Sequence, residues 1–156
     1  MPIKCELCQK DQEDAKRKEL AFARAEEERL AAVKAAEEKK LSRNNSDILA
    51  AVNAWCNNPA AAEAKYGHIS KWNTSRVTTM KELFKEKNKF NDDISDWDVS
   101  NVKDMNSMFS KNSAFTGDIS EWNVSNVKNM SKMFAGNDVF TGDISKWNVN
   151  NVTDMS

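Results

Sequence analysis

The residues with the greatest potential for chemistry are three cysteines and a single histidine. Cys5 and Cys8 have the C-x-x-C spacing of a zinc ligand pair or a redox site, whereas Cys56 and His68 lie far away in the sequence. A structural zinc site needs four such ligands, and a thioredoxin-type site needs a βαβ context that this pattern lacks. We therefore predict no metal, cofactor or catalytic site. A metal shared with another chain is the alternative for the Cys5–Cys8 pair.

Polar residues recur in columns spaced by 25 residues. We expect these columns to bond the backbone of the neighbouring repeat, because buried polar groups are usually paired. A calcium ladder along the carboxylates is the alternative, and calcium requires about six to eight oxygen ligands. With one histidine, no Ser/His site can be assembled, so we expect no enzyme. The columns are His68/Asp93/Asp118/Asp143, Ser70/Ser95/Ser120/Ser145 and Asn73/Asp98/Asn123/Asn148.

The element that must position these columns is an internal repeat. Trp72, Trp97, Trp122 and Trp147 are each 25 residues apart, and Ile, Val, Met and Phe positions keep the same phase. A fixed period of this length is typical of an array in which each repeat covers the apolar face of its neighbour. We expect Trp97 and Trp122 to be buried between neighbouring repeats.

Each repeat is predicted to contain one short strand and one short helix. The Asp-Ile-Ser-x-Trp portion has room for a strand of three residues, and the spacing from Val102 to Phe109 favours a helix of about two turns. The predicted fold class is therefore α/β. It is a right-handed, leucine-rich-repeat-like solenoid of 25-residue coils, with a helical N-terminal cap and a charged helical arm.

Four segments follow from this pattern: a short N-terminal segment (1–9), the charged arm (10–41), the cap (46–66) and the solenoid (67–156). The arm is rich in Ala, Glu, Lys and Arg, which are strong helix formers. Its apolar positions Leu20/Ala23 and Leu30/Val33 resemble coiled-coil pairs, but Glu27 and Lys34 interrupt them. A solvated single helix and weak self-association both remain open.

The cap is predicted as two helices, because Ile48, Val52 and Trp55 recur at helical spacing and Pro59 fits the start of a second helix. Residues 42–45 should form a hinge, Ser46 or Asn45 should cap the first helix, and Cys56 should be buried. At the other end, the fourth repeat stops in Met155-Ser156. We therefore expect an incomplete array with an open edge at residues 143–156, capable of self-association.

Composition restricts the partners. The net charge is −1, and no basic face indicates nucleic acid or an anionic membrane. No apolar run is long enough to span a bilayer. Residues 1–10 lack an apolar segment typical of a secretory signal. The chain as given is therefore expected to be cytoplasmic, with reduced thiols.

The run from Asp93 to Phe109, Asp-Ile-Ser-Asp-Trp-Asp-Val-Ser-Asn-Val-Lys-Asp-Met-Asn-Ser-Met-Phe, resembles the repeat of the BspA-like leucine-rich-repeat surface protein family. The resemblance covers about residues 46–156. It implies a right-handed repeat solenoid that acts in adhesion or protein binding, with no catalytic residues. It also implies a cell-surface or secreted location, in contrast to the missing export signal.

From these patterns we predict a non-catalytic repeat protein that binds a protein or a glycan through its repeat surface. The alternative is a structural scaffold in which the N-terminal helix is the association element.

Overall fold

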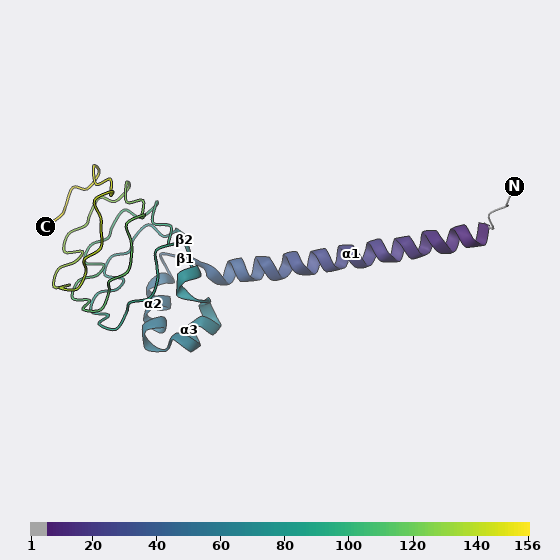
Figure 1. Cartoon of the computed structure of the whole chain (residues 1–156), viewed down its shortest axis with the longest axis horizontal. Coiled ribbons are helices and arrows are strands. Elements are labelled where there is room, and N and C mark those ends of the chain that lie inside the picture. The colour runs from purple at the N-terminus through teal and green to yellow at the C-terminus, as the bar shows by residue number, and fades with distance from the viewer. Residues whose placement is uncertain (1–5) are drawn as a thin grey trace. The chain divides into compact units, whose positions relative to one another are not determined.

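The computed structural model describes residues 6–156, which divide between Lys39 and Lys40 into two compact units. Helix α1 (Glu6–Leu41) accounts for the first unit and is labelled in Figure 1. Its composition explains the helix, since long stretches of Ala, Glu, Lys and Arg favour helical backbone. The helix begins before the predicted start at residue 10, and it buries none of its residues.

The second unit begins with a small sheet and two helices. Strand β1 (Ser42–Asn44) pairs in parallel with β2 (Asn73–Arg76). Helices α2 (Ile48–Asn57) and α3 (Pro59–Tyr66) follow β1, and a short 3-10 helix, η1 (Ile69–Lys71), precedes β2. Pro59 starts α3, whose first turn is capped because the Asn58 side chain accepts a hydrogen bond from the Ala61 N–H.

Two local predictions in this region are wrong. Residues 42–45 are not a hinge, because β1 is paired and Arg43 is buried with its guanidinium over the rings of Tyr66 and Trp72. The residue before α2 is Asp47 rather than Ser46 or Asn45. Asp47 is instead held by Arg43, whose Nη1 lies 2.7 Å from the Asp47 Oδ2.

The predicted leucine-rich-repeat-like solenoid is wrong as a fold class. Within residues 6–156, the regular elements are three α-helices, one 3-10 helix and a two-stranded parallel sheet. Beyond β2, the chain consists of turns, bends, loops and isolated bridges. Neither the strand expected at Asp-Ile-Ser-x-Trp nor the helix expected at residues 102–109 is present.

Backbone hydrogen bonding explains why that helix does not form. An α-helix requires each N–H to bond the carbonyl four residues earlier. Here the N–H groups of Met105, Ser107 and Phe109 donate instead to Asn129, Ser131 and Met133. Ser107 and Lys111 also have positive φ values of 55° and 52°, and left-handed residues are incompatible with a right-handed helix.

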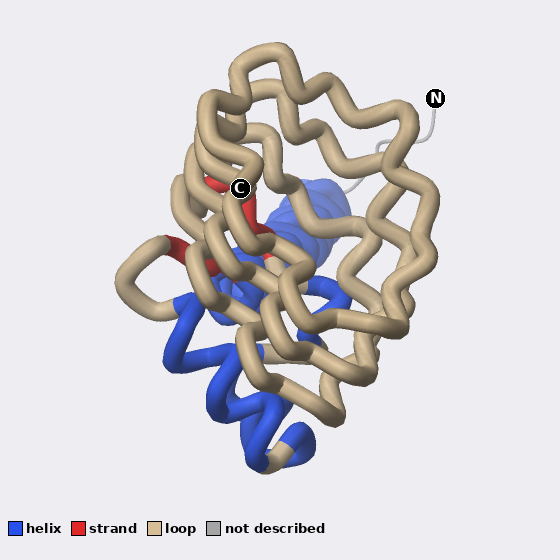
Figure 2. Tube along the Cα trace, turned by 90° about the vertical axis from the view of Figure 1, so that its left-hand side faces the viewer, coloured by secondary structure: helices blue, strands red, loops and turns tan. Residues whose placement is uncertain are grey.

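Hydrogen bonds connect segments that are 25 residues apart, and we call these segments layers. Residues 68–92 form the first, 93–117 the second, 118–142 the third and 143–156 the fourth. Thr79, Asp104, Asn129 and Asp154 form a continuous row of parallel bridges through all four layers. Figure 2 shows the corresponding loop segments lying one behind another.

Tryptophan packing is as predicted, with Trp97 and Trp122 only 3% and 4% exposed. The indole N–H of each donates to an isoleucine carbonyl in the preceding layer: Trp97 to Ile69 at 2.9 Å and Trp122 to Ile94 at 3.2 Å. Each indole therefore contributes both apolar burial and a polar bond between layers.

Two stacks of phenylalanine rings complete the core. Phe84, Phe109 and Phe134 stack with centroids 5.4 and 5.7 Å apart. A second stack contains Phe90, Phe115 and Phe140, with spacings of 6.0 and 6.1 Å. Aromatic pairs at these distances stabilise beyond simple area burial.

Candidate binding surface

The repeated aspartates lie in tight local turns. The Asp93 Oδ1 accepts hydrogen bonds from the N–H and the hydroxyl of Ser95, at 3.0 and 2.6 Å. Asp98 does the same with Ser100, and Asn123 with Ser125. Side chains of Asp, Asn and Ser favour such turns because they can replace backbone partners. The columns therefore bond their own turns, rather than mainly the next repeat as we predicted.

These turns also influence ionisation. The hydroxyl of Ser95 and then its N–H lower the pKa of Asp93, because hydrogen bonds to a carboxylate favour its charged form. The pKa of Asp118 is lowered first by the N–H of Ser120, and that of Asp143 first by the hydroxyl of Ser145. Local hydrogen-bond donors therefore favour the ionised form of these three aspartates.

A second backbone contact comes from an asparagine column. The side-chain amide of Asn101 donates to the Ser75 carbonyl at 2.8 Å, and Asn126 donates to the Ser100 carbonyl at 2.7 Å. Asn151 repeats the contact with Ser125. These amides join neighbouring layers. They make the contact that we had predicted for the Asp, Ser and Asn columns.

Charge is segregated within the second and third layers. Residues 93–102 and 118–127 contain five carboxylates and no Lys or Arg, and all five are exposed. We call them the acidic rows: Asp93, Asp96, Asp98, Asp118 and Glu121. The remainder of these layers contains Lys103, Lys111, Lys128 and Lys132, all exposed. Along each layer, therefore, an acidic portion precedes a mainly basic portion.

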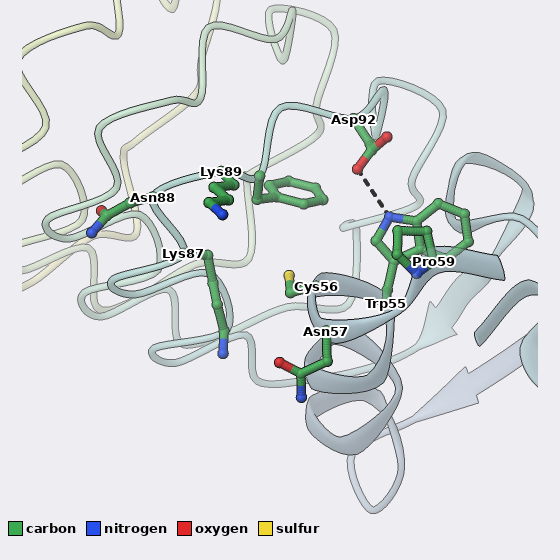
Figure 3. A pocket seen from close by; sticks show the side chains of 9 residues that line it. Trp55, Cys56, Asn57, Pro59, Lys87, Asn88, Lys89 and Asp92 are labelled. Carbon is green, nitrogen blue, oxygen red and sulfur yellow. Dashed lines mark hydrogen bonds between the residues drawn. The ribbon is translucent and has the colours of Figure 1, made fainter. Parts of the chain in front are cut away.

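A cavity of about 480 Å³ lies between the helices α2 and α3 and the end of the first layer (Figure 3). In it, the indole N–H of Trp55 donates to the Asp92 Oδ2 at 2.9 Å. Figure 3 shows Asp92 directed at this indole and Lys87 beside Cys56 and Asn57. The lining residues are Trp55, Cys56, Asn57, Pro59, Lys87, Asn88, Lys89, Phe90 and Asp92.

An apolar groove of about 340 Å³ lies at the third and fourth layers. Ile144 is 39% exposed and Met155 is 62% exposed, whereas their counterparts Ile119 and Met105 are buried. Self-association through this groove stays a prediction. Its lining residues are Met130, Met133, Phe134, Ile144, Ser145, Trp147, Val149 and Met155.

A family model described as "Mycoplasma protein of unknown function, DUF285" matches residues 53–156, about two thirds of the chain. The chain belongs to this DUF285 family. No curated protein and no solved structure matches the chain. The DUF285 match covers the end of α2, α3, the sheet strand β2 and all four layers, so it includes both the acidic rows and all the residues that line the cavity.

The cysteines and the histidine considered in the sequence analysis do not converge on one site in this DUF285 chain. Cys5 lies outside the described residues, and Cys8 is exposed on α1. Cys56 is half-buried rather than buried, and burial raises the pKa of its thiol. His68 packs edge-on against Trp55 with centroids 4.9 Å apart, and its Nδ1 accepts from the Ser70 N–H.

Residues 6–156 contain no group of three or more His, Cys, Asp or Glu side chains arranged to hold a metal ion. In the same part of the chain, no helix is both long and apolar enough to cross a membrane.

Sequence reasoning overlooked the cavity. The available indication was a break in the repeat: the second and third layers have Asn112 and Asn137 where the first has Lys87, and Gly117 and Gly142 where it has Asp92. Those departures could have marked the first layer as different. That α2 forms one wall of the cavity could be seen only in the tertiary structure.

Proposed function

We propose that this chain is a non-catalytic binding protein that holds a protein or glycan ligand on the exposed surface of its layers. The acidic rows carry the proposal, because three of their five carboxylates, those of Asp93, Asp98 and Asp118, accept hydrogen bonds within ordered turns of successive layers. A surface that is ordered before binding loses little conformational entropy when a ligand attaches. Complementary charge also accelerates and orients the encounter.

We include in this proposal a relationship to the BspA-like surface proteins. The Asp93–Phe109 motif resembles the BspA-like surface proteins, and the family match over the same residues supports that kinship. It favours adhesion as the biological setting, with a cell-surface or secreted location.

The test uses the full chain on two sets of probes, a printed glycan array and a panel of purified extracellular-matrix proteins. Two carboxylates without turn bonds are replaced in one variant, Asp96→Asn with Glu121→Gln. Because an exposed charge pair contributes about 0.2–1 kcal/mol, the double change should weaken binding about twofold to thirtyfold. The matched control is Lys103→Gln with Lys128→Gln, which removes exposed charges from the basic portion of the same layers.

Saturable binding that the acidic-row variant weakens and the lysine variant preserves would support the proposal. An absence of binding to both panels, or equal losses in both variants, would refute it.

A second candidate function is a scaffold joined through α1. Its specific support is that α1 extends over 36 residues without burying any of them. Leu20 and Leu30, which belong to the predicted coiled-coil seam, are both more than half exposed. Apolar residues at this spacing pack against a partner helix in coiled coils. The role would explain an otherwise uncovered stripe.

Light scattering at several concentrations tests this scaffold. The mass of the chain should rise with concentration, and Leu20→Lys with Leu30→Lys should abolish the rise. The control, Ala25→Lys with Ala32→Lys, places the same charges away from the seam. A monomeric mass at all concentrations would eliminate the scaffold function.

A further inference from the structure

The cavity bounded by α2, α3 and the first layer, which we call the first-layer pocket, has the size of a small-ligand site. Its volume is about 480 Å³, and ligand pockets range over about 300–1,000 Å³. Such sites combine apolar walls with a few convergent polar groups. Trp55, Pro59 and Phe90 supply apolar surface here, and Asn57, Asn88, Asp92 and two lysines supply the polar groups.

The first layer departs from the other layers at this pocket. In the second layer, the Asn112 Oδ1 accepts hydrogen bonds from the N–H groups of Ala114 and Phe115, at 3.1 and 3.0 Å. Asn137 forms the same turn in the third layer. Lys87 occupies the equivalent position and has no acceptor with which to form it. In the first layer, the Phe90 N–H donates to the Lys87 backbone carbonyl at 2.9 Å instead. The turn that starts at Lys87 therefore lacks the two side-chain bonds of the later layers and keeps one backbone bond in their place.

Folding does not explain the two lysines. Among the described residues, neither Lys87 nor Lys89 forms an ion pair. Asp92, in contrast, has a structural role, since its Oδ2 accepts the Trp55 indole N–H. No hydrogen bond joins its other oxygen, the Asn57 amide or the Asn88 amide nitrogen to the residues described, and Asn57 and Asn88 are both exposed.

We propose that the first-layer pocket binds an acidic monosaccharide unit of the uronic-acid type. Lys87 and Lys89 would attract its carboxylate. The Asn57 and Asn88 amides and the free Asp92 oxygen would bond its hydroxyls, each of which can both donate and accept. Pro59, which is exposed, would cover the apolar face of the ring, with small contributions from Trp55 and Phe90, each 3% exposed.

Electrostatics favours this ligand over other anions. A bare phosphate or sulfate would place its charge close to the Asp92 carboxylate, and like charges repel at short range. A sugar acid separates its carboxylate from hydroxyl groups that can donate to Asp92. A simple carboxylate such as acetate would contact the lysines but leave the amides without partners.

Trp55 provides a specific reporter. Of the five tryptophans, Trp55 alone donates its indole N–H to a carboxylate, whereas the other four donate to backbone carbonyls. Its indole resonance in proton–nitrogen correlation spectra can be assigned with a Trp55→Phe variant. Titrations of the full chain would use sodium D-glucuronate, D-glucose and sodium acetate at equal ionic strength.

Glucuronate should shift the Trp55 resonance saturably, with a dissociation constant of about 1–10 mM. Glucose and acetate should each bind at least about tenfold more weakly, because each lacks one half of the recognised groups. The decisive variant is Lys87→Asn with Lys89→Ala, which gives the first layer the residues found at Asn112 and Ala114. It should fold at least as stably as the native chain and lose the glucuronate response. Lys103→Gln, a change of an exposed lysine in the second layer, should retain it.

Two results would overturn the proposal: no saturable shift with glucuronate, or an equal response to acetate or glucose. A glucuronate response that persists in the Lys87→Asn/Lys89→Ala variant would also overturn it. The acidic rows are not altered in these variants, so failure here leaves the proposed ligand surface of the layers to its own test.

Discussion

Replacing Trp122 by alanine provides the most direct test of how the layers are joined. The side chain is 4% exposed, and its ring centroid lies 6.5 Å from that of Phe109. Removing a buried aromatic ring costs about 3–5 kcal/mol, through lost burial and the remaining cavity. Part of this loss is polar, because the Ile94 carbonyl would lose its indole donor. An unpaired buried polar group costs about 1–3 kcal/mol.

Two further variants separate the contributions. Trp122→Phe keeps a large ring but removes the donor, so it should cost about 1–3 kcal/mol. Trp147→Ala removes the equivalent residue from the fourth layer. It should cost less than Trp122→Ala, because Trp147 is already 9% exposed and borders the apolar groove.

Urea unfolding, followed by fluorescence of the remaining tryptophans, measures these differences, and calorimetry should show a fall of about 10–20 °C for Trp122→Ala. A loss below about 1 kcal/mol for that variant would contradict the burial argument. Equal losses for Trp122→Phe and Trp122→Ala would contradict the division between ring and donor.

Three other predictions address backbone strain, pH and the chain's division into units. Lys111→Gly should stabilise by about 0.5–1 kcal/mol in urea unfolding, because relief of a left-handed residue outweighs the added chain entropy; Gly136→Ala, at the equivalent position with φ 67°, should destabilise. The pKa of Asp118 is lowered in the fold, so its contribution is present above the unfolded pKa and is lost as pH falls through the folded pKa. The melting temperature of Asp118→Asn should therefore fall less than that of the native chain between about pH 7 and about pH 3, and equal falls would contradict the linkage. Limited proteolysis should cut before Lys40 and leave Lys40–Ser156 intact, since β1 is paired; early cleavage within Ser42–Asn44 would contradict this.

Local composition determined the helices of this chain. The Ala, Glu, Lys and Arg content of α1 favours helix without any tertiary contact, and Pro59 and Gly67 mark the start and end of α3. The repeat spacing likewise predicted the burial of Trp97 and Trp122, because residues in equivalent positions meet equivalent neighbours.

Tertiary structure decided the backbone between those residues. The spacing of Val102, Met105 and Phe109 fits a helix face. The N–H groups of Met105 and Phe109, however, bond carbonyls in the next layer. Left-handed backbone at Ser107 and Lys111 permits this arrangement, and neither residue type announces a positive φ. Local propensity cannot anticipate bonds between segments that are 25 residues apart.

The candidate sites divide in the same way. The columns that contain Asp93, Asp98 and Asp118 are visible in the sequence, and Asp, Asn and Ser at a spacing of two residues favour the turns that the structure shows, although we had predicted bonds to the next repeat. The first-layer pocket does not, because Trp55 and Asp92 are 37 residues apart and meet only when α2 packs against the first layer. Sequence carries the chemistry of each group, whereas convergence of those groups in one cavity requires the packed chain.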